Sequence, residues 1–403
     1  MHIPTRRALA AGAVALLAAM PAGAQAPGNG EATPVPAAVL RVEPERPRLP
    51  LSRLDLPPED LGFAGARLAT EDNRTTGTFL GQDFTLEEVS TSPDEAVAAL
   101  EELTASGIQF VVTMADADTL LELSDAVADE DVILFNATAP DDRLRGEDCR
   151  ANVFHTIPSR AMFADALAQF LMVKRWDRWF LVEGSHEADT ALADAYRRAA
   201  EKFGANIVES RVFEDTGGAR RTDAGHVQVQ AQMPVFTQRA PEHHVLVAAD
   251  ESEVFGSYLP YHTWDPRPVA GSAGLRPTTW HPAHEAWAGM QMQSRFDRLA
   301  SRPMRPEDFN VWVALRSIGE AATRTNSTDF ASLRDYMLGD EFQLGAFKGV
   351  AVSYRQWDNQ LRQPILLAHD NMVVSVSPQD QYVHQFSPLD SLGVDEPETT
   401  CSF

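Results

Sequence analysis

Short apolar runs alternate with amphipathic segments through most of this 403-residue chain. Runs such as 108–114 and 132–135 have the length and composition of buried strands, and segments such as 94–106 and 119–128 repeat apolar residues at helical spacing. Strands that alternate with helices usually pair in parallel through right-handed crossovers. The alternation therefore predicts an α/β fold built on parallel sheets.

The same alternation resumes in a second part of the chain. Strands are expected at 179–182, 206–212 and 244–249, with helices at 187–203 and 227–237 between them. A chain of this length is longer than one hydrophobic core usually accommodates. We therefore expect two α/β lobes.

The N-terminus has the layout of an export signal. Paired arginines precede an apolar run from Ala8 to Met20, and small residues up to Ala24 form a cleavage site. We expect a signal peptide over 1–24, a disordered leader over 25–37 and a periplasmic mature protein. The paired arginines leave both the general and the twin-arginine export routes open.

The formal net charge of −24 argues against nucleic acid or an anionic membrane surface as a partner. No interior stretch approaches the ~20 apolar residues that a membrane helix needs. We expect no nucleic-acid partner and no membrane insertion. The net charge leaves an anionic small ligand open, because a pocket can be locally basic.

Cys149 and Cys401 are the only cysteines. In an oxidising compartment a disulfide between them is favoured, and two free thiols are the alternative. The bridge would tie the C-terminal tail to a loop in the first half of the chain.

The stretch 132–162 has features of a ligand site. A buried strand is followed by small polar residues, and Ser159 is placed as the N-cap of a helix that begins at Arg160. Ligands of open α/β sheets bind at such carboxyl ends of strands. A guanidinium at a helix start can bind a carboxylate, although a surface arginine or an ion pair between lobes is an equal alternative for Arg160.

Motifs typical of enzymes are absent from the sequence. There is no Gly-x-Ser-x-Gly, no P-loop and no dinucleotide fingerprint. His281 and His284 lie in Trp-His-Pro-Ala-His-Glu, which is not a zinc motif. We predict no enzyme, no catalytic residue, no metal site and no required cofactor. A secreted metal-dependent hydrolase that uses these histidines is the alternative of another class.

The whole mature chain resembles the type I periplasmic solute-binding proteins of ABC transporters, especially the leucine/isoleucine/valine group. The likeness is carried by Gly-Ala-Arg-Leu-Ala-Thr-Glu-Asp-Asn at 65–73, by 107–112 and by Asn-Ala-Thr-Ala-Pro at 136–140. It implies two lobes around a cleft, each a parallel sheet flanked by helices. We assign 38–158 plus 286–348 to lobe 1, and 159–285 plus 349–403 to lobe 2.

A narrower likeness is to a subgroup associated with pyrroloquinoline-quinone-dependent alcohol oxidation. It is carried by 158–162, 270–275, 279–281 and 361–366. This resemblance implies the quinone as bound ligand, held by arginines, hydroxyls and stacking aromatics. The ligand-binding residues that we expect are Arg46, Arg53, Thr113, Ala137, Thr138, Arg160, Glu187, Asp250, Trp280 and His281.

Other ligands remain open at this point. An amino acid or an aromatic alcohol product would pair its ammonium, where it has one, with Asp250 or Glu251. In either case the resemblance implies a monomeric receptor that closes on its ligand and delivers it to permease subunits.

Overall fold

The computed structural model describes residues 32–43, 56–216 and 228–403. Its first sheet is parallel throughout and has the strand order β2-β1-β3-β4-β5. This order confirms the α/β prediction for lobe 1. The strands are β1 (Thr33–Val42), β2 (Gln82–Thr91), β3 (Phe110–Met114), β4 (Ile133–Asn136) and β5 (Val153–His155).

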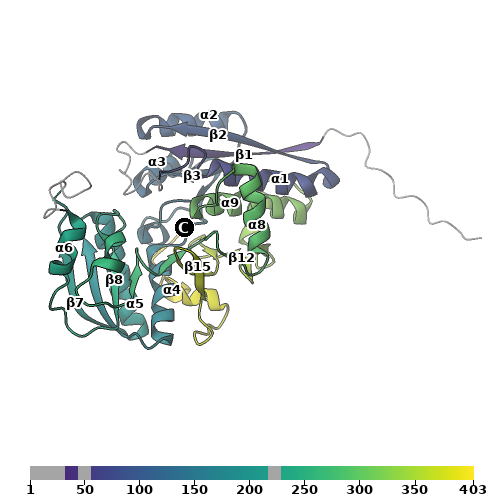
Figure 1. Cartoon of the computed structure of the whole chain (residues 1–403). Helices are drawn as coiled ribbons and strands as arrows, with labels where there is room; N and C mark the ends of the chain where they lie inside the picture. Colours follow the sequence, from purple (N-terminus) through teal and green to yellow (C-terminus); the bar gives the residue numbers. More distant parts are fainter. Residues whose placement is uncertain (1–31, 44–55, 217–227) are drawn as a thin grey trace, which may run out of the picture. The chain divides into compact units, whose positions relative to one another are not determined.

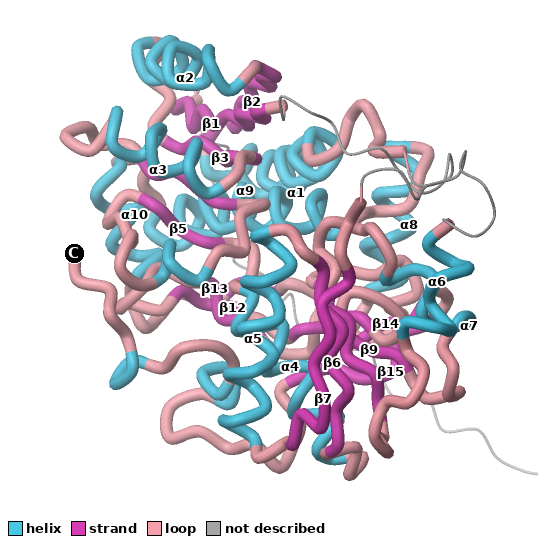
Figure 2. The backbone as a smooth tube through the Cα atoms, turned by 90° about the vertical axis from the view of Figure 1, so that its left-hand side faces the viewer, coloured by secondary structure: helices cyan, strands magenta, loops and turns pink. Residues whose placement is uncertain are grey.

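The second sheet is also parallel, with the order β7-β6-β8-β9. Figure 2 shows β6 and β7 side by side, with α5 along them. The strands are β6 (Arg178–Gly184), β7 (Asn206–Phe213), β8 (Val245–Ala249) and β9 (Val269–Gly271). The helices of this lobe are α4 (Arg160–Val173), α5 (Glu187–Phe203), α6 (Val229–Phe236) and α7 (Leu259–His262).

The helices of lobe 1 come from both ends of the chain. In Figure 1, α8 and α9 lie beside α1, and their buried side chains share one core with the sheet. Helix α8 is polar apart from a narrow stripe and was not predicted from the sequence. The helices are α1 (Phe63–Leu80), α2 (Ala96–Ala105), α3 (Ala117–Ala126), α8 (Gly289–Ala300), α9 (Pro306–Thr325) and α10 (Phe330–Leu338).

Short antiparallel strands complete both lobes. One set has the order β11-β12-β13 and the other β10-β14-β15. Their bounds are β10 (Arg276–Thr278), β11 (Leu344–Gly345), β12 (Ala351–Tyr354), β13 (Leu361–Arg362), β14 (Ile365–His369) and β15 (Met372–Ser377).

The lobe boundaries differ from those expected. Trp280 is buried in the core of lobe 1, and so are Val352 and Tyr354 of β12. Ile365 and Leu367 of β14 are buried in the core of lobe 2. The expected boundaries at 286 and 349 are therefore wrong: the chain crosses between the lobes near 278–280 and again between β13 and β14. Apolar content alone could not show which core a short strand joins.

The expected disordered leader over 25–37 extends too far, because β1 begins at Thr33. The backbone N–H of Thr33 donates to Gly81 O, on the β2 side of β1. Because successive backbone N–H groups of a strand point to opposite sides, the nitrogens of Pro34 and Pro36 face away from β2. On that side β3 pairs only from Ala38 onward. The prolines thus cost the sheet no hydrogen bond, which is where a strand tolerates them.

The predicted disulfide between Cys149 and Cys401 is confirmed, with Cα atoms 5.6 Å apart. Among the helices of the described residues, none is long and apolar enough to cross a membrane.

Candidate ligand-binding cleft

A cavity of about 790 Å³ lies where loops of lobe 1 meet helix starts of lobe 2. Its lobe 1 wall follows the carboxyl ends of β3 and β4, and its lobe 2 wall includes the first turn of α5 and the loop after β8. Ligands of α/β proteins bind at such strand ends.

The loop after β4 owes its shape to Asn136. The side-chain oxygen of Asn136 accepts hydrogen bonds from the backbone N–H groups of Thr138 (3.3 Å) and Ala139 (2.9 Å), and its amide donates to Ala139 O (2.8 Å). Such a short polar side chain stabilises a tight turn directly after a strand. Thr138 lines the cavity, and its hydroxyl donates to Ala115 O (2.9 Å) in the loop after β3. The two loops therefore hold each other in place.

Arg160 begins α4, and its guanidinium lies in the cavity wall. The predicted N-cap forms, with Ser159 Oγ accepting from Met162 N (3.3 Å). Nε and Nη2 of Arg160 each lie 2.7 Å from an oxygen of Glu251, and Nη1 lies 2.9 Å from Asp141 Oδ1. Burial by itself lowers the pKa of Arg160, but the hydrogen bond and charge of Glu251 and the charge of Asp141 raise it above its ordinary value. The cation is thus already neutralised by protein carboxylates.

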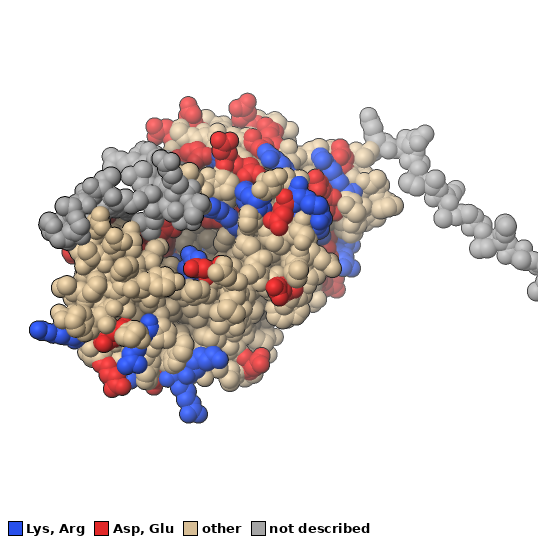
Figure 3. All heavy atoms as spheres, viewed as in Figure 1, with Lys and Arg blue, Asp and Glu red and all other residues tan. Residues whose placement is uncertain are grey.

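Arg143, which also belongs to the described part of the wall, is paired as well. Arg143 binds Asp118, and its Nη1 lies 2.7 Å from Asp148. Figure 3 shows the same mixture of signs on the face turned to the viewer, where basic and acidic side chains stand next to one another around a hollow. Among the residues that the structure describes, seven carboxylates line the cavity against two arginines, namely Asp116, Asp118, Asp141, Asp142, Glu187, Asp194 and Glu251 against Arg143 and Arg160.

The start of α5 supplies the facing wall. His186 is the N-cap residue, and its Nε2 lies 2.9 Å from Asp215 Oδ2. Glu187 is exposed and lines the cavity. Helix α3 begins at Ala117, which also lines the cavity. Because the N-terminus of a helix carries a partial positive charge, these helix starts can favour a single anionic group within an otherwise acidic cleft.

Three of the expected ligand-binding residues meet at this cavity: Thr138, Arg160 and Glu187. Arg46 and Arg53 lie outside the described residues. The remaining five, namely Thr113, Ala137, Asp250, Trp280 and His281, do not line it.

Each of the five has a structural role. Thr113 is buried and donates to Phe135 O (3.2 Å), and the carbonyl of Ala137 accepts from Asn310 Nδ2 (2.9 Å). Asp250 accepts from three backbone N–H groups, at Val254, Phe255 and Gly256. It turns into the protein, and its neighbour Glu251 turns into the cleft.

The two aromatic candidates are placed by the core of lobe 1. Trp280 is 1% exposed and stacks on Phe309 with ring centroids 5.2 Å apart, so its face is not open to a ligand. His281 Nδ1 accepts from Ala283 N (3.1 Å), and His284 Nε2 bonds to Phe347 O (2.8 Å). Within the described ranges no group of three or more His, Cys, Asp or Glu residues is arranged to hold a metal ion.

Sequence reasoning missed most of the acidic wall. Asp116 and Asp118 lie at the start of α3, shortly after β3, and Asp141 and Asp142 lie a few residues after β4. Their positions after predicted strands were a usable signal. Arg160 attracted attention instead, because a single cation at a helix start looks like an anion anchor when its carboxylate partners are far away in the sequence.

Comparison with known proteins agrees with this architecture. Residues 60–233 match the family of periplasmic binding proteins. Leu/Ile/Val-binding protein homolog 3 of Brucella melitensis is 28% identical over 145 residues, which cover 35% of this chain and 39% of that protein. The match thus spans well under half of the curated relative.

Solved structures are similar over almost the whole chain. The leucine-, isoleucine-, valine-, threonine- and alanine-binding protein of Brucella ovis, in a closed conformation, has a TM-score of 0.70 at 14% identity and covers 92% of this chain and 99% of that one. A branched-chain amino acid ABC transporter ligand-binding protein of Burkholderia xenovorans has a TM-score of 0.68 at 18% identity, with 91% and 99% covered. This chain therefore has the two-lobe α/β fold of these periplasmic binding proteins, with parallel sheets flanked by helices.

Proposed function

We propose that this protein is the periplasmic substrate-binding component of an ABC transporter and that its ligand is a small solute with a protonated amine, of the amino acid type. The two-lobe fold and the cavity between strand ends and helix starts support the receptor role. The similar proteins named above are named for leucine, isoleucine and valine or for branched-chain amino acids. On this proposal the protein catalyses no reaction.

The charge of the cleft carries the proposal for the ligand. Among the described residues of the wall, carboxylates outnumber arginines, and Arg143 and Arg160 both already bind carboxylates. An ammonium group gains attraction in such a site, and an added carboxylate meets repulsion. A zwitterionic amino acid suits the cleft because its one carboxylate can lie at a helix N-terminus while its ammonium faces the acids.

Pyrroloquinoline quinone, the ligand implied by the narrower resemblance, is the competing candidate. Its three carboxylates would have to displace Glu251 and Asp141 from Arg160, or else find other cations. A partly buried bidentate pair gives up such a partner only at a cost. The described part of the cleft thus favours the amine over the quinone.

A titration panel tests the proposal on the purified mature chain. Leucine, its decarboxylated amine, its deaminated acid and pyrroloquinoline quinone would each be titrated by calorimetry. We expect saturable binding of leucine or its amine and none of the deaminated acid. Saturable micromolar binding of the quinone with no heat from the amines would overturn the ligand assignment.

A charge-only variant sharpens the result. Glu187→Gln removes one carboxylate of the cleft at constant size, and we expect weaker binding of the amines. Glu201→Gln, on the same helix but outside the cavity lining, is the matched control and should bind as the unaltered protein does.

A further inference from the structure

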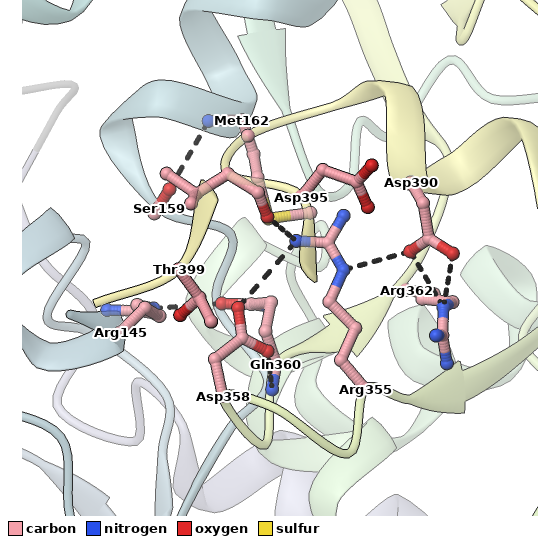
Figure 4. A network of polar contacts seen from close by, with 12 residues as sticks. Arg145, Ser159, Met162, Arg355, Asp358, Gln360, Arg362, Asp390, Asp395 and Thr399 are labelled. Atoms are coloured by element: carbon pink, nitrogen blue, oxygen red, sulfur yellow. Dashed lines mark hydrogen bonds and ion pairs between the residues drawn. The ribbon is translucent and has the colours of Figure 1, made fainter. Parts of the chain in front are cut away.

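The C-terminal residues 387–401, here called the C-terminal strap, contact both lobes. Within the strap, successive backbone carbonyls bind cations of opposite lobes: those of Ser391 and Gly393 bind a lysine of lobe 2, and those of Leu392 and Val394 bind an arginine of lobe 1. Figure 4 shows this region, with Arg355 and Arg362 on either side of Asp390. The strap therefore lies at the junction of the lobes.

The lobe 2 anchor is on helices α4 and α5. Lys202 Nζ donates to Ser391 O (3.1 Å) and Gly393 O (2.9 Å), and it also lies 2.8 Å from the fully buried carboxylate of Asp165. Asp165 accepts from Gly393 N (2.8 Å). Leu392 is buried in the lobe 2 core. These contacts hold the middle of the strap to lobe 2.

The lobe 1 anchor is Arg355, which directly follows β12 and is 1% exposed. It donates to the carbonyls of Leu389 (3.3 Å), Leu392 (2.7 Å) and Val394 (3.3 Å), and its Nε lies 3.0 Å from Asp390 Oδ1. A buried guanidinium that loses such partners is left uncompensated, which is costly. Separation of Arg355 from the strap is therefore opposed.

The end of the strap is fixed to lobe 1 covalently. Cys401 forms a disulfide with Cys149, which lies in the segment that connects β4 to β5 of the first sheet. The segment from Gly393 to Cys401 would reach roughly 28 Å if fully extended. It is instead shortened by a 3₁₀ turn at Glu396–Glu398, capped by Asp395, whose carboxylate also lies 3.0 Å from His384 Nε2.

We propose that the C-terminal strap is a restraint across the hinge, closed by the Cys149–Cys401 disulfide, that limits how far the two lobes separate in the ligand-free protein. The strap adds a covalent link to the crossings of the main chain between the lobes. Opening beyond its reach requires the bonds of Lys202 or Arg355 to break or the turn at 396–398 to unfold. A restrained protein samples fewer open conformations, so it loses less conformational entropy when it closes on a ligand. The restraint therefore also favours ligand binding.

The test is a distance measurement between the lobes without ligand. Spin labels on a ketone-bearing unnatural residue at Glu101 in lobe 1 and Glu242 in lobe 2, both exposed, avoid the cysteines. We expect a narrow distance distribution for the intact protein. The Cys149→Ser/Cys401→Ser variant should give a broader distribution extending to separations that the intact protein does not reach, and so should the intact protein reduced under native conditions.

A second variant separates the restraint from simple stabilisation. Lys202→Met keeps the disulfide but removes the lobe 2 anchor, so it should also broaden the distribution. Lys174→Met, at the exposed end of α4, is the control and should leave it unchanged. Identical distributions in the oxidised and reduced protein, with only a lower melting temperature on reduction, would overturn the proposal. Because no ligand is present, this outcome is independent of the ligand assignment.

Discussion

Arg160 and Glu251 form a two-pronged ion pair, in which Nε and Nη2 of the guanidinium each lie 2.7 Å from a carboxylate oxygen. The pair joins the start of α4 to the loop after β8, and Asp141 adds a contact from lobe 1. Arg160 therefore serves the folded protein as well as the cleft.

Removal of this arginine should destabilise the protein. Arg160→Ala leaves two partly buried carboxylates without their cation, and we expect the free energy of unfolding to fall by about 2 kcal/mol. Urea denaturation measures the change. Arg334→Ala, which breaks an exposed ion pair with Asp335, is the comparison and should stay within about 0.5 kcal/mol of the unaltered protein.

The same substitution discriminates between ligand classes. If the ligand is anionic and binds Arg160, its affinity should fall by about 1.5–3 kcal/mol in Arg160→Ala. If the ligand carries an ammonium, the variant releases Glu251 and Asp141 from their cation, and the affinity should hold or rise. Calorimetry with leucine and with pyrroloquinoline quinone reads both cases; a large loss of amine binding by a folded variant contradicts the amine proposal.

We expect Thr138 to support ligand binding through the hydrogen bond that its hydroxyl donates to Ala115 O. Thr138→Val keeps the shape but removes the donor, so the loops after β3 and β4 lose a tie worth about 1 kcal/mol. We expect roughly fivefold weaker ligand binding, measured by titration. Thr138→Ser retains the hydroxyl and should bind almost normally; equal losses in both variants would argue against a role for the hydrogen bond.

Because His155 is buried, we expect the folded protein to lose stability in mild acid. His155 is 1% exposed, and burial, followed by the charge of Arg145, holds its pKa well below the ordinary value of 6.5. The unfolded chain takes up a proton near pH 6.5, whereas the folded chain does not. The stability contributed by neutral His155 is therefore complete above that pH and falls by up to about 1.4 kcal/mol per unit as the pH drops below it.

Denaturation between pH 7.5 and 5.5 tests this dependence. The stability of His155→Asn should depend less on pH than that of the unaltered protein. His369→Gln, at an exposed position, is the control and should have the same pH dependence as the unaltered protein. Parallel profiles for all three proteins would exclude His155 as the cause.

Gly65 marks a close approach of α1 to α9. A Cβ at this position would overlap the backbone carbonyl of Asp308, which cannot move as a side chain would. Gly65→Ala should therefore destabilise the protein by about 1–3 kcal/mol. Gly345→Ala is the matched change, because nothing lies within 4 Å of a Cβ there. Thermal unfolding of both variants would show whether the loss of stability comes from the overlap with Asp308 or from the change in backbone freedom.

Local patterns in the sequence were sufficient to predict the order of most of the elements. Helix α5 spans 187–203 as expected, and the expected N-cap Ser159 forms. Helical periodicity, capping side chains and β-branched runs act over a few residues, so they can be read without knowledge of the fold. The disulfide was also predictable, since the chain has only one possible pair.

The tertiary structure alone decided which polar residues face the cleft. Arg160 and Glu251 are 91 positions apart, and no local pattern shows that one neutralises the other. Likewise, Asp250 follows a strand end that looks suited to a ligand, but its carboxylate binds backbone N–H groups. Trp280 lies in a loop that looks equally suited, but its ring stacks on Phe309. Burial, pairing and the direction of a side chain are set by the packing of distant segments, whereas the position of each element is set by its own residues.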